Sequence, residues 1–130
     1  MKTSLLRSLK AILDKRSREA LVDSHVRNGI AFQIRAMRRE RNWTQEDLAK
    51  QADMKPTQIT RVENPVYGSH TVTTLRRIAS AFDVALVVRF VPFSELLKWD
   101  EGSRNMAPAS FAEELDWAAG RGHLQIADGE

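Results

Sequence analysis

The spacing of apolar residues along the chain predicts a protein built mainly of helices. Over 1–23, leucines and isoleucines recur three or four positions apart with basic residues between them, which is typical of an amphipathic helix. A second helix is expected over 25–41, where one stripe carries Ile30, Ile34 and Met37. The pattern also allows it to continue from the first helix, with a weak point at 28–29.

Capping and breaking residues divide the next stretch into short helices. Thr44 is an N-cap candidate, and Asp47 stands three positions later as its capping-box partner. Pro56 ends that helix because it disfavours helical backbone at the residue before it, yet it suits the first turn of a new helix that runs to about residue 64. A further amphipathic helix is expected over 71–82.

The apolar pattern changes after residue 83. Residues 84–91 are apolar and largely β-branched, which predicts one strand. A single strand leaves its backbone groups unpaired, so pairing with the same strand of a second copy predicts a two-fold dimer. The alternative is that this segment packs as an extended tail on its own domain. The residues expected at the dimer contact are Leu86, Val88 and Phe90.

Composition narrows the chemistry available to the chain. The 130 residues include no cysteine, which excludes disulfides, zinc fingers, iron–sulfur clusters and thiol nucleophiles. The 3 histidines have no ligand-like spacing, so no metal site and no cofactor are expected. The sequence offers neither a nucleophile–base arrangement nor a phosphate-binding glycine loop, so no enzyme activity is expected. No apolar run approaches the roughly 20 residues that span a bilayer, so no membrane association is expected.

The net charge of +3 conceals two halves of opposite sign. Residues 1–61 contain 14 basic and 7 acidic side chains (+7), and residues 62–130 contain 6 basic and 10 acidic (−4). A basic half indicates a polyanionic partner, most commonly nucleic acid, although a solvated basic face is the alternative. From residue 100 onward there are 2 basic and 7 acidic side chains, so we expect this tail to project away from a duplex.

Residues 44–64 have the sequence shape of a helix-turn-helix, in which two short helices are joined by a tight turn. Leu48 and Ala52 pack the first helix on a core, and Ile59 and Val62 pack the second. The other positions of the second helix then point outward, where hydrogen-bonding side chains reach base edges and phosphates in a major groove. These outward residues are Lys55, Thr57, Gln58, Thr60 and Arg61.

The segment IRAMRRERNWTQEDLAKQADMKPTQITRVEN resembles the DNA-binding domain of lambda-repressor/Cro-like regulators, also called the XRE family. The resemblance covers about 28–84 and continues through TTLRRIASAFDV. It implies a compact helical domain that binds operator DNA as a dimer and regulates transcription. Asp53 stands where this family often has glycine, and aspartate tolerates the left-handed backbone conformation better than most residues.

The resemblance also implies roles for individual side chains. It assigns Gln45 to a phosphate contact that steadies the second helix, and Asn64 to a backbone contact with DNA. It implies a structural ion pair between Arg38 and Glu63. The positions that usually face bases or nearby phosphates are held here by Lys55, Pro56, Thr57 and Arg61.

These patterns together predict a mainly α-helical fold, in which a lambda-repressor-like helix-turn-helix domain carries an N-terminal helical extension, a single C-terminal strand and short helices. Four zones are expected along the chain. They are a basic amphipathic helix (1–24), the DNA-binding domain (25–84), a strand and short helix that dimerise (85–99), and a linker, short acidic helix and flexible tail (100–130).

The function expected is that of a homodimeric repressor that binds a palindromic double-stranded DNA operator without catalysis or a cofactor. The alternative is an antitoxin, which binds a toxin protein and represses its own operon. In that case the N-terminal helix and residues 93–130 are the candidate toxin-binding surfaces. Either function implies a cytoplasmic, nucleoid-associated protein of a prokaryote or phage.

Overall fold

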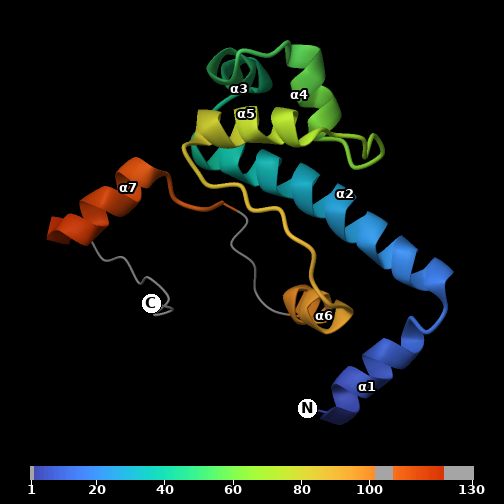
Figure 1. The fold of residues 1–130 in the computed structure, drawn as a ribbon. Coiled ribbons are helices and arrows are strands. Elements are labelled where there is room, and N and C mark those ends of the chain that lie inside the picture. The colour runs from blue at the N-terminus through green and yellow to red at the C-terminus, as the bar shows by residue number, and fades with distance from the viewer. Residues whose placement is uncertain (1, 102–106, 122–130) are drawn as a thin grey trace.

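A computed structural model of the protein describes residues 2–101 and 107–121, and all the structure in this part is helical or irregular (Figure 1). The helices in chain order are α1 (Lys2–Ala11), α2 (Lys15–Glu40), α3 (Gln45–Ala52), α4 (Pro56–Val62), α5 (Val72–Phe82), α6 (Phe93–Glu101) and α7 (Phe111–Asp116), followed by a π-helical turn (Trp117–Arg121). Figure 1 shows α3 and α4 above α5, which lies along the C-terminal part of α2. At the opposite end of α2, α1 packs against α6.

The break between the first two helices does not lie where the sequence predicts it. The chain leaves the helix after Ala11 and begins α2 at Lys15, and α2 then continues without interruption through Gly29. The carboxylate of Asp14 accepts hydrogen bonds from the Ser17 hydroxyl and backbone N–H, both at 3.0 Å, and these bonds lower the pKa of Asp14. This cap satisfies amides that a helix start leaves unpaired, whereas glycine inside a helix costs only about 0.5–1 kcal/mol.

The described residues contain no strand, so the strand predicted over 84–91 is wrong. A β-branched apolar run adopts strand structure only when a neighbouring strand pairs with its backbone, and the described part of the chain supplies none. The segment instead connects α5 to α6. Its first residue is anchored, because the Val84 N–H donates to the Ala79 carbonyl at 3.0 Å and the Val84 side chain packs on the core.

One hydrophobic core holds α3 and α4 on α2 and α5. Its largest fully buried side chains are Phe82, Leu48 and Ile59. The ring of Trp43 stacks on Phe82 with centroids 5.5 Å apart, and the Arg41 guanidinium lies 4.9 Å from the Phe82 centroid. The sequence pattern therefore identified the core faces of these helices correctly, including Ile34 and Met37 of α2.

The predicted capping box at the start of α3 is confirmed. The Thr44 hydroxyl accepts from the Asp47 N–H at 3.1 Å, and the Asp47 carboxylate accepts from the Thr44 N–H at 2.8 Å. These hydrogen bonds lower the pKa of Asp47. The helix ends at Asp53, whose φ of 54° lies in the left-handed region, as expected for a residue that replaces glycine at this turn.

Replacing Thr44 with alanine is expected to lower the free energy of unfolding by about 1 kcal/mol, because the Asp47 N–H at the start of α3 loses the hydroxyl that accepts its hydrogen bond. Urea denaturation monitored by circular dichroism measures this loss. Thr57→Ala is the matched control, since Thr57 is exposed and lies within the first turn of α4 rather than at its cap. Equal losses in the two variants would contradict the assignment of Thr44 as a cap.

The acidic helix α7 is tied to the end of α5 through Asp83. The Asp83 carbonyl accepts from the Phe111 N–H at 2.9 Å, and its carboxylate accepts from the Ala112 N–H at 3.3 Å. Asp83 itself has a left-handed φ of 59° and ends α5. The short acidic helix expected within 100–130 is therefore present as α7. Residues 102–106 and 122–130 of the predicted linker and tail lie outside the described residues.

Candidate nucleic-acid interface

The second helix of the helix-turn-helix, α4, has one buried face and one exposed face. Ile59 and Val62 point into the core. The exposed face carries the residues that the sequence analysis selected, which are Lys55, Pro56, Thr57, Gln58, Thr60 and Arg61. A short helix that packs on the core through its apolar face presents its other side to solvent, and this is the arrangement that major-groove recognition requires.

The start of α4 is organised by two of these residues. Pro56 occupies the first turn, where its missing N–H leaves no hydrogen bond unmade. The side-chain carbonyl of Gln58 accepts from the Lys55 N–H at 2.8 Å. Gln58 therefore keeps only its amide N–H groups for a further partner, whereas Lys55 and Thr57 extend from the same turn.

Gln45 connects α3 to α4 along their outer edge. Its side-chain carbonyl accepts from the Thr60 hydroxyl at 3.0 Å, and its amide donates to Glu63 at 3.3 Å. The Thr60 hydroxyl also lies 3.1 Å from the Pro56 carbonyl within its own helix. Gln45 thus fixes α4 relative to the N-terminus of α3, where the partial positive charge of a helix attracts phosphate.

A buried carboxylate ties the end of α4 to α2. Glu63 is only 2% exposed, and Arg38 binds it through two nitrogens at 2.6 and 2.9 Å. These hydrogen bonds raise the pKa of Arg38. Arg35, which the sequence analysis missed, donates to the Glu63 carbonyl at 3.0 Å. Its position three residues before Arg38 places it on the same face of α2, and this spacing was the available signal.

The loop after α4 adds a further aromatic contact. The Arg61 guanidinium lies 5.9 Å from the centroid of the Tyr67 ring, within the range of a cation–π interaction. The Asn64 side chain accepts from the Val66 N–H at 3.0 Å and so shapes this loop. Tyr67 also escaped the sequence analysis, although it is the only tyrosine of the chain and stands six positions after Arg61.

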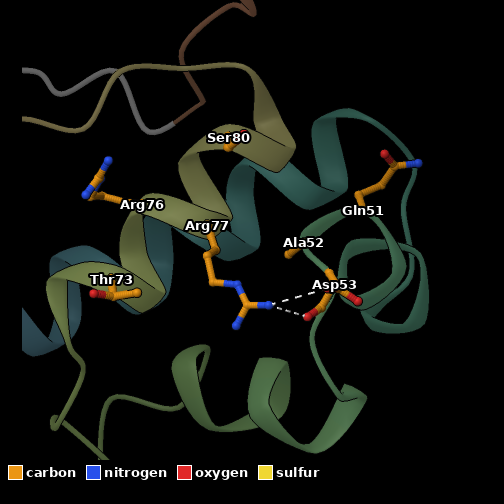
Figure 2. A pocket seen from close by; sticks show the side chains of 7 residues that line it. All are labelled: Gln51, Ala52, Asp53, Thr73, Arg76, Arg77 and Ser80. Atoms are coloured by element: carbon orange, nitrogen blue, oxygen red, sulfur yellow. Dashed lines mark hydrogen bonds and ion pairs between the residues drawn. The ribbon is translucent and has the colours of Figure 1, made fainter.

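Near the turn between α3 and α4, the helices α3 and α5 border a shallow depression of about 450 Å³ (Figure 2). Figure 2 shows Arg77 reaching across it to Asp53, whose carbonyl accepts at 2.7 Å and whose carboxylate lies 3.7 Å away. The arginine thereby binds the backbone of the left-handed residue that ends α3. This contact supports the turn between the two helices of the motif.

The basic N-terminal half does not form one continuous surface around α4. The 6 basic residues from Lys2 to Arg18 belong to α1 and the first turn of α2. With 26 residues, α2 is about 39 Å long, and α3 and α4 lie at its other end (Figure 1). The exposed face of α4 carries its own cation, Arg61, and Lys55 lies at its N-cap.

The residues expected at a dimer contact differ in their exposure. Leu86 is half-buried, whereas Val88 and Phe90 are exposed, and the Phe90 ring has no protein cover at all. Within residues 2–101 and 107–121, no three histidine, aspartate or glutamate side chains gather in a group that could hold a metal ion. None of the helices in that part is long and apolar enough to cross a bilayer.

Comparison with known proteins identifies the segment that contains these helices. Residues 34–88 match the family model described as helix-turn-helix. The match runs from the second half of α2 through α3, α4 and α5. Neither the curated proteins nor the solved structures include a significant match to the chain. Residues 34–88 are therefore similar to a helix-turn-helix family of the lambda-repressor-like (XRE) type.

Proposed function

We propose that the protein is a sequence-specific DNA-binding transcriptional regulator, which acts as a homodimeric repressor on a palindromic operator. The observation that carries this proposal is the polar outer face of α4, presented on a helix whose other face is buried. Such a helix fits the width of a major groove. Its proposed role requires neither catalysis nor a cofactor and places the protein in the cytoplasm of a prokaryote or a phage-infected cell.

The side chains around α4 divide into two proposed roles. Arg61 and Thr57 read base edges, since guanidinium and hydroxyl groups form hydrogen bonds with bases in the major groove. Gln45, Lys55 and Asn64 contact phosphates and set the register of the domain on the duplex. Pro56 contributes shape at the start of the helix, and the amide of Gln58 and hydroxyl of Thr60 complete the polar face.

The homodimer is proposed from the exposed apolar side chains that follow α5. Val88 and Phe90 are exposed beside the half-buried Leu86, and covering them removes apolar surface from water. A two-fold dimer of this kind binds two half-sites about 34 Å apart. Analytical ultracentrifugation tests the proposed homodimer. Phe90→Asp is expected to yield monomers, whereas the control Phe111→Asp on α7 is expected to retain the dimer.

Selection of binding sites from random duplex DNA, followed by a salt titration, tests the proposed function. We expect an enriched site with inverted half-sites and an affinity that falls steeply with salt, because phosphate contacts release counterions. Absence of any enriched site would overturn the regulator proposal. An enriched site without symmetry would overturn the dimer alone.

Arg61→Ala is expected to weaken binding to the selected site by about 1–3 kcal/mol, because a bidentate arginine–base contact is lost. Fluorescence anisotropy with the labelled duplex measures the loss. Arg16→Ala is the matched control: it removes the same charge from an exposed position at the far end of α2 and should change affinity little. Unchanged affinity in Arg61→Ala would exclude its base-reading role.

A second candidate function is protein binding of the antitoxin type. It is favoured by the exposed Phe111 and Leu115, which lie one helical turn apart on α7 beside acidic side chains, together with the exposed Trp99 of α6. Co-expression with the product of a neighbouring small toxin-like reading frame tests it. A complex that Phe111→Ser and Leu115→Ser together abolish, without loss of operator affinity, would support this function.

A further inference from the structure

The loop that follows α4 is braced from outside by a side chain of α2. The Arg27 guanidinium donates to the Val66 carbonyl at 2.7 Å and lies 3.5 Å from the Pro65 carbonyl. Arg27 is itself held by Asp23, one turn earlier, at 2.9 Å. The brace fits closely: a Cβ added at Gly68, whose φ is +34°, would lie 2.5 Å from the Arg27 Cζ.

The same loop is also fixed from inside. The Asn64 side chain accepts from the Val66 N–H at 3.0 Å, and the Asn64 carbonyl accepts from the Tyr67 N–H at 3.1 Å. The backbone that carries Tyr67 is therefore held on both sides, by Asn64 at the end of α4 and by Arg27 from α2. A ring attached to such a backbone has a restricted position, although Tyr67 is about half exposed.

Tyr67 faces a residue of the proposed DNA-reading helix. Its ring centroid lies 5.9 Å from the Cζ of Arg61. Arginine loses considerable side-chain freedom when its planar fork is placed against a base edge, and a group already held in position loses less. An aromatic face attracts a guanidinium without occupying its N–H donors in ordinary hydrogen bonds, so these remain available for a base.

We propose that Tyr67 is a specificity-positioning residue, which directs the Arg61 guanidinium toward its base, and that Arg27 maintains Tyr67 in place through the loop. This inference rests on the proposed function, because it assumes that Arg61 reads DNA. It adds a three-residue relay, Arg27, Tyr67 and Arg61, that connects the middle of α2 to the exposed face of α4. The relay is expected to affect the discrimination between bases. It leaves the affinity for phosphate unchanged, because Arg61 keeps its charge when Tyr67 no longer positions it.

A double-mutant cycle between Arg61 and Tyr67 tests the proposal with the full chain. The probes are the selected duplex and a scrambled duplex of the same length. Tyr67→Leu is expected to lower affinity for the selected duplex about two- to fivefold, the range of an exposed cation–π contact, and to leave affinity for the scrambled duplex unchanged. Tyr67→Phe keeps the aromatic face and should retain wild-type affinity. In the Arg61→Ala background, Tyr67→Leu should have no further effect.

Two results would overturn the inference while the proposed function stands. The first is that Tyr67→Leu discriminates between the selected and the scrambled duplex as well as the wild type does. The second is that Tyr67→Leu lowers the affinity for the selected duplex equally in the wild-type and Arg61→Ala backgrounds, which would mean that Tyr67 acts on DNA directly. Wild-type affinity in Arg61→Ala would overturn the base-reading role of Arg61 and this inference together. Thermal denaturation of each variant confirms that the exposed substitutions leave the fold intact.

The brace is tested separately with Arg27→Gln, which shortens the side chain and removes its charge. The expected result is a loss of discrimination similar to that of Tyr67→Leu, with no further loss when the two changes are combined. Arg18→Gln, which alters an α2 arginine bound to the Leu13 carbonyl instead, is the matched control and should retain discrimination. Additive losses from Arg27→Gln and Tyr67→Leu would overturn the relay.

Discussion

Glu63→Ala is expected to lower the free energy of unfolding by about 3–5 kcal/mol, because it leaves the Arg38 guanidinium poorly exposed and without its carboxylate. The substitution removes both Arg38 bonds and the acceptor for the Gln45 amide at once. Arg38 retains a bond to the Trp43 carbonyl, at 3.0 Å, which cannot neutralise its charge. Urea denaturation of wild type and variant at the same protein concentration measures the difference.

Glu40→Ala is the matched control for this experiment, since Glu40 is the exposed last residue of α2. Its effect should stay within about 0.5 kcal/mol, as for most surface substitutions. Because Glu63 also orders Gln45 and the end of α4, its replacement should weaken operator binding even where the protein remains folded. A stability loss below 1 kcal/mol would mean that Arg38 finds another partner or reaches solvent, contrary to the buried pair described here.

Phe82→Ala is expected to cost about 3–5 kcal/mol of stability, the usual range for a large aromatic side chain in a packed core. Phe82 is 1% exposed, and it supports both the stacked Trp43 ring and the Arg41 guanidinium. Its removal leaves a cavity beside α5 that neighbouring helices fill only in part. Thermal or urea unfolding reports the loss.

The phenylalanine at position 111 provides a control of the same chemistry. It lies on α7 with most of its side chain exposed, so Phe111→Ala should change stability by about 0.5 kcal/mol or less. Both substitutions remove an aromatic ring, so a difference between their stability losses reports the contribution of burial. Similar losses at both positions would contradict the placement of Phe82 at the centre of the core.

The parts of the fold that the sequence predicts well are those with strong local signals. Thr44 and Asp47 satisfy each other within four residues, and Pro56 fixes the start of α4, so neither depends on distant contacts. Apolar periodicity placed Ile59 and Val62 in the core because α4 has a single buried face. These signals were sufficient for the helix-turn-helix and for the helix that follows it.

The errors arose where structure depends on partners that periodicity does not reveal. Asp14 starts α2 as its N-cap, and apolar spacing does not reveal this cap because leucines continue on both sides of it. The β-branched run over 84–91 has the composition of a strand, but strand structure requires a paired neighbour. Arg27 could not be told from a solvated cation by sequence alone, because its partners, the Pro65 and Val66 carbonyls, are brought beside it only by the fold.

The connection through Asp83 has a consequence for the architecture of the chain. Because the Phe111 N–H donates to the carbonyl of Asp83, which ends α5, the two ends of the connection from Asp83 to Phe111 meet at the helix-turn-helix domain. Doubling the length of a flexible closed loop costs only about 0.6 kcal/mol in entropy. We therefore expect added length in this connection to cost little stability, provided that Val84 and Ala107 keep their packing on the core and α6 keeps its packing on α1.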